Sequence, residues 1–203
     1  MMEIIKTNDC KMKICVYCAS SSKIDSSFFD ATEKLAIEFV KENIEIVYGG
    51  GATGLMGKLA DTIIEHGGKI KGIMPKFMNE VEWAHKGVTD FELTETMHER
   101  KAKFLVNIDG VVTLPGGSGT LEELLETISL KRLGLFTKPI VILNTNEYYN
   151  PLRQMLQNCV SEKFMHEKHL EMWTFVDDPE QVIPALRNST IWDKEAINFA
   201  VNK

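Results

Sequence analysis

Residues 44–68 read IEIVYGGGATGLMGKLADTIIEHGG, which is a β-branched apolar run, a cluster of glycines and a helical stretch in direct succession. The length and composition of the first five residues are typical of a buried strand. The helical stretch extends from about Leu55 to His66 and stops at Gly67-Gly68, which suits a left-handed helix end. A strand, a glycine turn and a helix in this order favour a βαβ unit and therefore a parallel sheet.

The same alternation of strands and helices continues in both directions from this segment. The predicted strands are residues 12–17, 44–48, 69–74, 110–114, 139–143 and a short edge strand at 173–176. The predicted helices are residues 28–40, 55–66, 97–107, 120–133, 151–164 and 178–186. Residues 76–95 show no firm periodic signal, so no regular element is predicted there.

This pattern predicts an α/β fold, a single doubly wound Rossmann-like domain with a parallel sheet and helices on both faces. We assign the domain to residues 12–190, with an N-terminal extension at 1–11 and a C-terminal tail at 191–203. Ligands of such folds bind at the carboxyl ends of the strands, near the point where the strand order reverses. We therefore expect a site in the loops that follow Tyr17, Tyr48, Met74 and Leu114.

Composition and charge argue against several classes of partner. The chain has 203 residues and a formal net charge of −6, without the basic excess of a protein that binds nucleic acid polymers. Its first residues lack the apolar run of a signal peptide, and no apolar segment approaches membrane-spanning length. We therefore expect a cytoplasmic protein with no membrane partner. Cys15 and Cys18 form a C-x-x-C pattern without a second pair, which favours reduced, partly buried thiols over a redox or zinc site.

The first glycine loop, Gly49 to Gly54, contains G-x-G-x-x-G between a strand and a helix. That motif binds a dinucleotide when an acidic residue lies about 20 positions on, where it holds the ribose hydroxyls. Here the next strand ends in Gly72-Ile-Met-Pro75, without an acid. Nicotinamide or flavin binding is therefore disfavoured, and a tight turn with close helix packing explains this loop by itself.

The second glycine loop, Pro115 to Thr120, also lies between a strand and a helix. Its amides and the start of the following helix offer N–H donors to an anion. The loop lacks the lysine of a Walker A sequence, so a single phosphate fits better than a triphosphate. Thr120-Leu-Glu-Glu123 also fits a capping box, with the threonine as N-cap, and that is the competing explanation of Glu123. The predicted buried stripe of this helix is Leu121, Leu124, Leu125 and Ile128.

Met97-His-Glu-Arg-Lys101 places two adjacent cations at a predicted helix start. A solvated helix face accounts for such a pair in most proteins. A helix N-terminus disfavours cations, however, so the position of Arg100 and Lys101 indicates an anion nearby.

Taken together, these segments resemble the Lonely Guy (LOG) family of cytokinin riboside 5′-monophosphate phosphoribohydrolases, many of which are labelled lysine decarboxylase-like. The resemblance covers about Met12 to Phe164 and rests on four motifs. They are P-G-G-x-G-T-x-x-E at Pro115–Glu123, M-x-x-R-K at Met97–Lys101, Y-G-G-G-x-x-G-L-M-G at Tyr48–Gly57 and C-x-S-S at Cys18–Ser21.

The resemblance implies that Arg100 and Glu123 are catalytic. It also implies substrate contacts from Ser20, Gly51, Glu82, Arg100, Lys101, Gly116, Gly117, Ser118, Gly119, Thr120, Leu121, Glu122 and Ser129. Ser118 departs from the tyrosine common in plant members, and Ser129 departs from a threonine there while keeping the hydroxyl. Glu82 lies in the segment that matches the family least firmly. Family members form homodimers or larger assemblies and need no cofactor or metal, and we expect the same here.

The implied reaction is hydrolysis of the N-glycosidic bond of AMP or of an N6-prenylated AMP, giving free base and ribose 5-phosphate. Positive charge develops on the ribose in such a reaction, and an ionised Glu123 stabilises it. Arg100 stays protonated, so we assign it to orienting Glu123 and the substrate. The alternative is a non-catalytic nucleotide or molybdenum-cofactor carrier that uses the same phosphate loop. Pyridoxal-dependent decarboxylation needs a Schiff-base lysine with a partner for the ring nitrogen, and no such set stands out.

Overall fold

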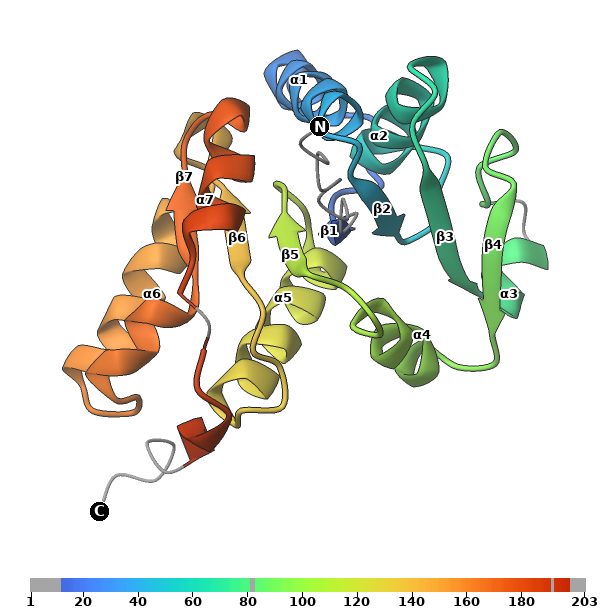
Figure 1. Cartoon of the computed structure of the whole chain (residues 1–203). Helices are drawn as coiled ribbons and strands as arrows, with labels where there is room; N and C mark the ends of the chain where they lie inside the picture. The colour runs from blue at the N-terminus through green and yellow to red at the C-terminus, as the bar shows by residue number, and fades with distance from the viewer. Residues whose placement is uncertain (1–11, 81–82, 191, 198–203) are drawn as a thin grey trace, which may run out of the picture.

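The computed structural model describes residues 12–80, 83–190 and 192–197. These residues form a seven-stranded sheet of order β4-β3-β2-β1-β5-β6-β7, and every pairing in it is parallel (Figure 1). The strands are β1 (Lys13–Tyr17), β2 (Glu45–Tyr48), β3 (Ile70–Pro75), β4 (Asp90–Thr94), β5 (Gly110–Thr113), β6 (Ile140–Leu143) and β7 (Thr174–Val176). The sheet is thus parallel throughout its described length, as predicted.

The helices connect successive strands and lie outside the sheet. The α-helices are α1 (Ser26–Lys41), α2 (Gly54–Glu65), α3 (Lys76–Glu80), α4 (Met97–Phe104), α5 (Ser118–Arg132), α6 (Asn150–Ser161) and α7 (Val182–Asn188). Short 3₁₀ turns occur at η1 (Thr145–Glu147), η2 (Glu167–Met172), η3 (Pro179–Gln181) and η4 (Lys194–Ala196). None of the helices in the described ranges is long and apolar enough to cross a bilayer.

Two apolar clusters pack on opposite faces of the sheet. Side chains such as Phe39 of α1 and Ile63 of α2 belong to one cluster, which α7 completes. Phe104 of α4 and Leu124 of α5 belong to the other, together with α6. Because both faces are covered, the central strands are buried along nearly all of their length. The doubly wound α/β fold with helices on both faces is confirmed.

The strand order reverses between β1 and β5. β1 pairs with β2 on one side, where Cys15 lies opposite Val47, and with β5 on the other, where Val16 lies opposite Val112. The chain winds outward from β1 to β4, then crosses by α4 to β5 and winds outward again. The loops after β1 and β5 therefore separate at the carboxyl edge of the sheet, where a ligand site is expected.

The main correction to the sequence analysis concerns residues 76–95, where no regular element was predicted. The structure has α3 and strand β4 there, and β4 pairs with β3 from Lys71↔Asp90 to Pro75↔Thr94. β4 is an edge strand with the mixed sequence DFELT, so it lacks the apolar run that marks the central strands. Phe91 lies against Gly72, where an added Cβ would be 2.4 Å from its ring, so this packing depends on a glycine.

The Cys15 and Cys18 side chains are more deeply buried than the sequence predicts. Both are free, with 0% and 7% of their surfaces exposed, and they belong to the apolar clusters on opposite faces of the sheet. The His166 amide donates to His169 Nδ1 at 3.0 Å, and His169 has no exposed surface. Both patterns therefore contribute to packing.

Candidate active site

A pocket of about 580 Å³ opens at the carboxyl edge of the sheet, where β1 and β5 diverge. Its walls come from the loops after β1, β2, β3 and β5, which are the four loops named from the sequence. Of the predicted site residues, those that line it are Ser20, Gly51, Arg100, Gly117, Ser118, Gly119, Thr120, Glu122 and Glu123. The fold therefore brings the separate motifs of the sequence into one cavity.

The second glycine loop leads directly into helix α5. The helix begins at Ser118, and its N-cap is Gly117 in an extended conformation with no side-chain cap. The predicted capping box is therefore wrong: Thr120 and Glu123 lie inside the helix, not at its cap. Thr120 instead packs on Gly116, where an added Cβ would lie 2.2 Å from its hydroxyl oxygen. A helix N-terminus without a side-chain cap, facing a pocket, is suited to an anion.

The first glycine loop supports the site through close packing. Gly54 has φ +62, and a Cβ there would lie 2.4 Å from the carbonyl carbon of Ser20. The loop is fastened to the segment after β1 by two bonds, from Thr53 Oγ1 to the Ser20 carbonyl at 2.9 Å and from the Met56 amide to the Ala19 carbonyl at 3.2 Å. Its glycines thus let two backbones touch, which fits the packing explanation better than dinucleotide binding.

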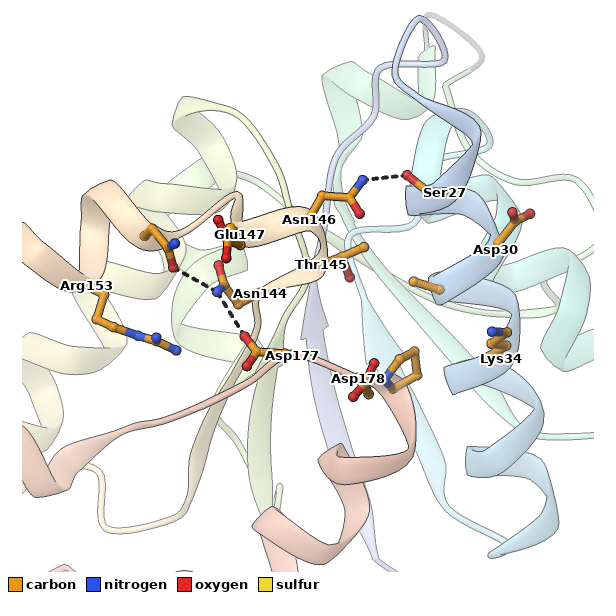
Figure 2. Close-up of a pocket in the computed structure, with 13 residues that line it drawn as sticks. Ser27, Asp30, Lys34, Asn144, Thr145, Asn146, Glu147, Arg153, Asp177 and Asp178 are labelled. Carbon is orange, nitrogen blue, oxygen red and sulfur yellow. Dashed lines mark hydrogen bonds between the residues drawn. The ribbon is translucent and has the colours of Figure 1, made fainter.

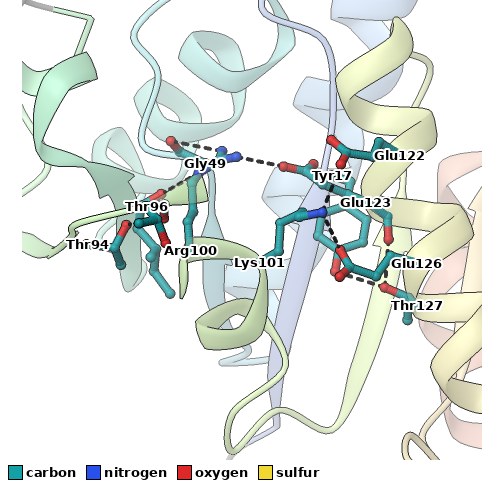
Figure 3. Close-up of polar contacts among 11 residues, drawn as sticks. Tyr17, Gly49, Thr94, Thr96, Arg100, Lys101, Glu122, Glu123, Glu126 and Thr127 are labelled. Carbon is teal, nitrogen blue, oxygen red and sulfur yellow. Dashed lines mark hydrogen bonds and ion pairs between the residues drawn. The ribbon is translucent and has the colours of Figure 1, made fainter. Parts of the chain in front are cut away.

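Arg100 is buried between the two glycine loops, with only 7% of its surface exposed. Its Nε donates to the Ile73 carbonyl at 3.0 Å and its Nη2 to the Gly49 carbonyl at 3.5 Å. Its Nη1 donates to Glu123 Oε1 at 2.8 Å (Figure 3), and its guanidinium lies 4.6 Å from the centre of the Phe104 ring. Backbone carbonyls and a ring therefore fix the cation, which in turn fixes the carboxylate.

Glu123 is not the unperturbed glutamate that the sequence analysis assumed. Its side chain is 12% exposed and lies beside Arg100 in the pocket wall. Burial raises the pKa of its carboxyl group above the ordinary glutamate value, and the Arg100 guanidinium opposes that rise. A partly desolvated carboxylate that keeps one oxygen in contact with a cation can interact strongly with charge developing in the pocket.

Lys101 faces α5 and pairs with two carboxylates of that helix. Its Nζ lies 2.8 Å from Glu122 Oε1 and 3.0 Å from Glu126 Oε2 (Figure 3). The bond to Glu122, followed by the bond to Glu126, raises the pKa of the Lys101 ammonium group. Lys101 lies in the last turn of α4, so the prediction that it stands at a helix start is wrong. Its partners are side chains of α5, and together with the Arg100–Glu123 pair these bonds join the two helices.

The remaining predicted contacts lie away from the pocket lining or outside the described residues. Gly116 packs under Thr120, and Leu121 of α5 is partly buried against the core. Ser129 is exposed and donates its hydroxyl to the Leu125 carbonyl one turn back. Leu125 itself is 42% exposed, so it does not belong to the buried stripe predicted for this helix. Glu82 lies outside the residues that the structure describes.

Sequence reasoning missed the apolar part of the pocket wall. Its side chains are Met56, Met74, Met78, Trp83 and Met97, which come from three separate stretches of the chain. Scattered methionines give no periodic signal, so only the folded chain brings them together. Thioether side chains are flexible and pack well against flat rings, which suits a wall facing a heterocyclic base.

The fold and the pocket define a Rossmann-like α/β protein in which a helix N-terminus without a side-chain cap lines the pocket. The family model described as "Possible lysine decarboxylase" matches residues 56–186. A cytokinin riboside 5′-monophosphate phosphoribohydrolase of Arabidopsis thaliana is 34% identical over 198 residues, which are 93% of this chain and 92% of the relative. Another from the same plant is 40% identical over 153 residues, 75% of this chain and 72% of the relative. The chain belongs to the Lonely Guy (LOG) family.

Solved structures of another group share the fold. A molybdenum cofactor carrier protein from Chlamydomonas reinhardtii superposes with a TM-score of 0.67 at 16% identity, over 87% of this chain and 96% of that one. A molybdenum cofactor binding protein from Rippkaea orientalis gives a TM-score of 0.66 at 18% identity, with the same coverage. At such identities the likeness shows a common architecture alone.

Proposed function

We propose that this chain hydrolyses the N-glycosidic bond of a purine nucleoside 5′-monophosphate, either AMP or an N6-prenylated AMP, to free base and ribose 5-phosphate. The observation that supports this most strongly is the Arg100–Glu123 pair, bonded at 2.8 Å in the pocket wall just past the N-terminus of α5. The phosphoribohydrolase activity for which the family relatives are named agrees with it.

The N-terminus of α5 is the proposed phosphate site. Gly117, Ser118 and Gly119 line the pocket there, and no side chain caps the helix. An anion at this end of a helix meets several backbone N–H groups and the favourable end of the helix dipole. A phosphate held there places the ribose one helical turn along, next to residue 123, and this orientation lowers the barrier to reaction.

Glu123 then acts on the sugar. The bond between C1′ and the base nitrogen breaks with its electron pair going to the base; water adds to C1′, and a proton passes to the departing base. The carboxylate stabilises the positive charge on the ribose and orients the attacking water. Arg100 lowers the pKa of the Glu123 carboxyl group against the effect of burial and holds this side chain in one orientation. This scheme uses water and the chain's own residues, so we propose no cofactor or metal.

The two rival functions account for the pocket less well than hydrolysis does. A molybdenum-cofactor or nucleotide carrier requires an anion site but has no need of a buried carboxylate beside the sugar. Among the described residues that line the pocket there is no lysine, whereas pyridoxal-dependent decarboxylation forms a Schiff base with one. The buried Lys131 donates to the Lys138 carbonyl at 2.7 Å, away from this pocket.

We also propose that residues 12–190 act as one catalytic domain within a cytoplasmic homodimer or dimer-based oligomer. Exposed apolar side chains on and after α5 support an assembly surface: Leu125 is 42%, Leu133 41% and Leu135 73% exposed.

The acidic net charge of −6 supports a small nucleotide substrate over a nucleic acid polymer.

The test is Glu123→Gln, assayed with AMP, isopentenyladenosine monophosphate and the two corresponding nucleosides. Chromatography of free base and ribose 5-phosphate should show cleavage of the monophosphates by the wild type and loss of at least about a hundredfold in the variant. Glu126→Gln is the matched control, because Glu126 lies on the same helix and pairs with Lys101 but does not line the pocket. Full activity of Glu123→Gln, or equal cleavage of the nucleosides, would contradict the proposal.

A further inference from the structure

Three successive carbonyl groups at the end of β5 are each held by a separate donor. Tyr149 donates its hydroxyl to the Leu114 carbonyl at 2.8 Å. The Ala19 amide donates to the Pro115 carbonyl at 3.2 Å, and Tyr148 donates its hydroxyl to the Gly116 carbonyl at 2.7 Å. Hydrogen bonds to its carbonyl oxygens therefore fix the backbone that leads into the proposed phosphate site.

Fixing a carbonyl also fixes the amide on the other side of the same peptide plane. The peptide group is planar and trans, so the C=O of one residue and the N–H of the next point in opposite directions. The bond from Tyr148 to the Gly116 carbonyl thereby directs the N–H of Gly117, which lines the pocket and is the N-cap of α5. The bond from Tyr149 to the Leu114 carbonyl directs no amide, because the residue after Leu114 is Pro115, which has no N–H. The Tyr149 hydroxyl also interacts with the backbone of Gly116, one residue before Gly117.

Gly117 is held on its carbonyl side, where the Leu121 amide donates to it at 3.0 Å, but that carbonyl belongs to the peptide plane after the one that carries the Gly117 N–H. It has no side chain, and a Cβ built there would meet no atom within 4 Å. Its peptide plane therefore depends on its hydrogen bonds. We propose that Tyr148 is a positioning residue, whose hydroxyl orients the Gly117 amide toward the substrate phosphate; this inference rests on the proposed phosphate site.

The segment that supplies Tyr148 is itself firmly held. Asn146 and Glu147 both adopt left-handed conformations, with φ +54 and +58, which turn the chain sharply after β6. Asn146 donates to Ser27 Oγ at 2.6 Å and Asn144 donates to Asp177 Oδ1 at 3.1 Å, around a hollow of about 610 Å³ (Figure 2). The Tyr148 ring lies edge-on to Phe28 and Tyr149, with ring centres 5.9 and 4.9 Å away. The turn after β6 thus holds the Tyr148 side chain in a fixed position.

The test compares Tyr148→Phe with Tyr149→Phe, each of which removes one hydroxyl that bonds to the same loop. Affinity for ribose 5-phosphate is measured by calorimetry, KM and kcat are measured for AMP, and melting temperature is recorded for both variants. Tyr148→Phe should weaken ribose 5-phosphate binding and raise KM about three- to tenfold, with kcat nearly unchanged. Tyr149→Phe should lower the melting temperature more, because Tyr149 is 2% exposed, but should weaken both affinities less than Tyr148→Phe does, because the Tyr149 hydroxyl does not bond to the carbonyl that precedes the Gly117 amide.

Equal loss of affinity in the two variants, or none in Tyr148→Phe, would overturn the inference. If the wild type binds no ribose 5-phosphate, the proposed phosphate site is wrong, and the role of Tyr148 is overturned with it. Failure of the catalytic proposal is different again: the wild type would bind ribose 5-phosphate but release no base from AMP. In that case the binding comparison between the two variants still decides the role of Tyr148.

Discussion

The two glycine loops look alike in sequence but differ in what surrounds them. In the loop after β2, a Cβ at Gly54 would lie 2.4 Å from Ser20 backbone, and one at Gly51 would lie 2.7 Å from the Met56 side chain. In the loop after β5, a Cβ at Gly116 would crowd Thr120 at 2.2 Å, but one at Gly117 or Gly119, which face the pocket, would meet nothing within 4 Å. One loop uses glycine so that parts of the chain can touch, and the other leaves space for something outside the chain. A glycine motif therefore indicates a ligand only where its glycines border open space.

Gly54→Ala should have the largest effect, because it tests the packing role of the first loop. The substitution meets both a left-handed backbone, φ +62, and the Ser20 backbone, so we expect a loss of about 3 kcal/mol or more in the free energy of unfolding. Denaturant titration measures this. Gly67→Ala is the matched control: its φ is +72 but no atom lies within 4 Å, so it should cost only about 1 kcal/mol. Equal losses would show that close packing in the first loop is unimportant.

Arg100→Gln tests the residue that bridges the two loops. We expect kcat/KM to fall about a hundredfold, because the fixed cation beside Glu123 is lost. The remaining activity should also shift with pH. Glu123 must be ionised to act, and Arg100 lowers its pKa against the effect of burial, so removing the cation raises that pKa further. As the pH is lowered, the variant should therefore lose its activity at a higher pH than the wild type does. If the fall in activity on the acidic side of the pH–rate profile is unchanged, the assigned role of Arg100 is contradicted.

Gly117→Ala should have the smallest effect on the fold and a selective one on binding. The backbone at Gly117 has φ −85, which alanine accepts, and the space around it is open, so stability should change by less than about 0.5 kcal/mol. The methyl group would intrude on the proposed phosphate site, so KM for AMP should rise about tenfold. Kinetics and thermal melting separate the two effects. An unchanged KM would place the phosphate elsewhere.

The central sheet could be predicted because its strands are covered on both faces. Such strands read as unbroken apolar runs, as in Ile140–Leu143, and their ends locate the pocket. Asp90–Thr94 was missed because an edge strand need not be apolar, and its pairing depends on a strand fifteen or more residues away. Local sequence therefore predicts the covered parts of this fold better than its margins.

The candidate site was predictable in part from motifs and only poorly from local patterns. Thr120-Leu-Glu-Glu123 has the form of a capping box, but the N-cap is Gly117, three residues earlier than the Thr120 that this pattern implies. The partners of Lys101 lie on another helix and became visible only in the fold. The methionines of the pocket wall share no spacing in the chain. Contacts between distant segments account for each of these differences.

The account depends on a phosphate at the start of α5 that delivers C1′ of the ribose to Glu123. The most direct test is a crystal structure of the Glu123→Gln variant with AMP bound. We predict phosphate oxygens on the amides of the Gly117–Thr120 segment and C1′ about 3.5 Å from the side chain of residue 123. A phosphate bound elsewhere, or a ribose far from residue 123, would contradict the proposed mechanism.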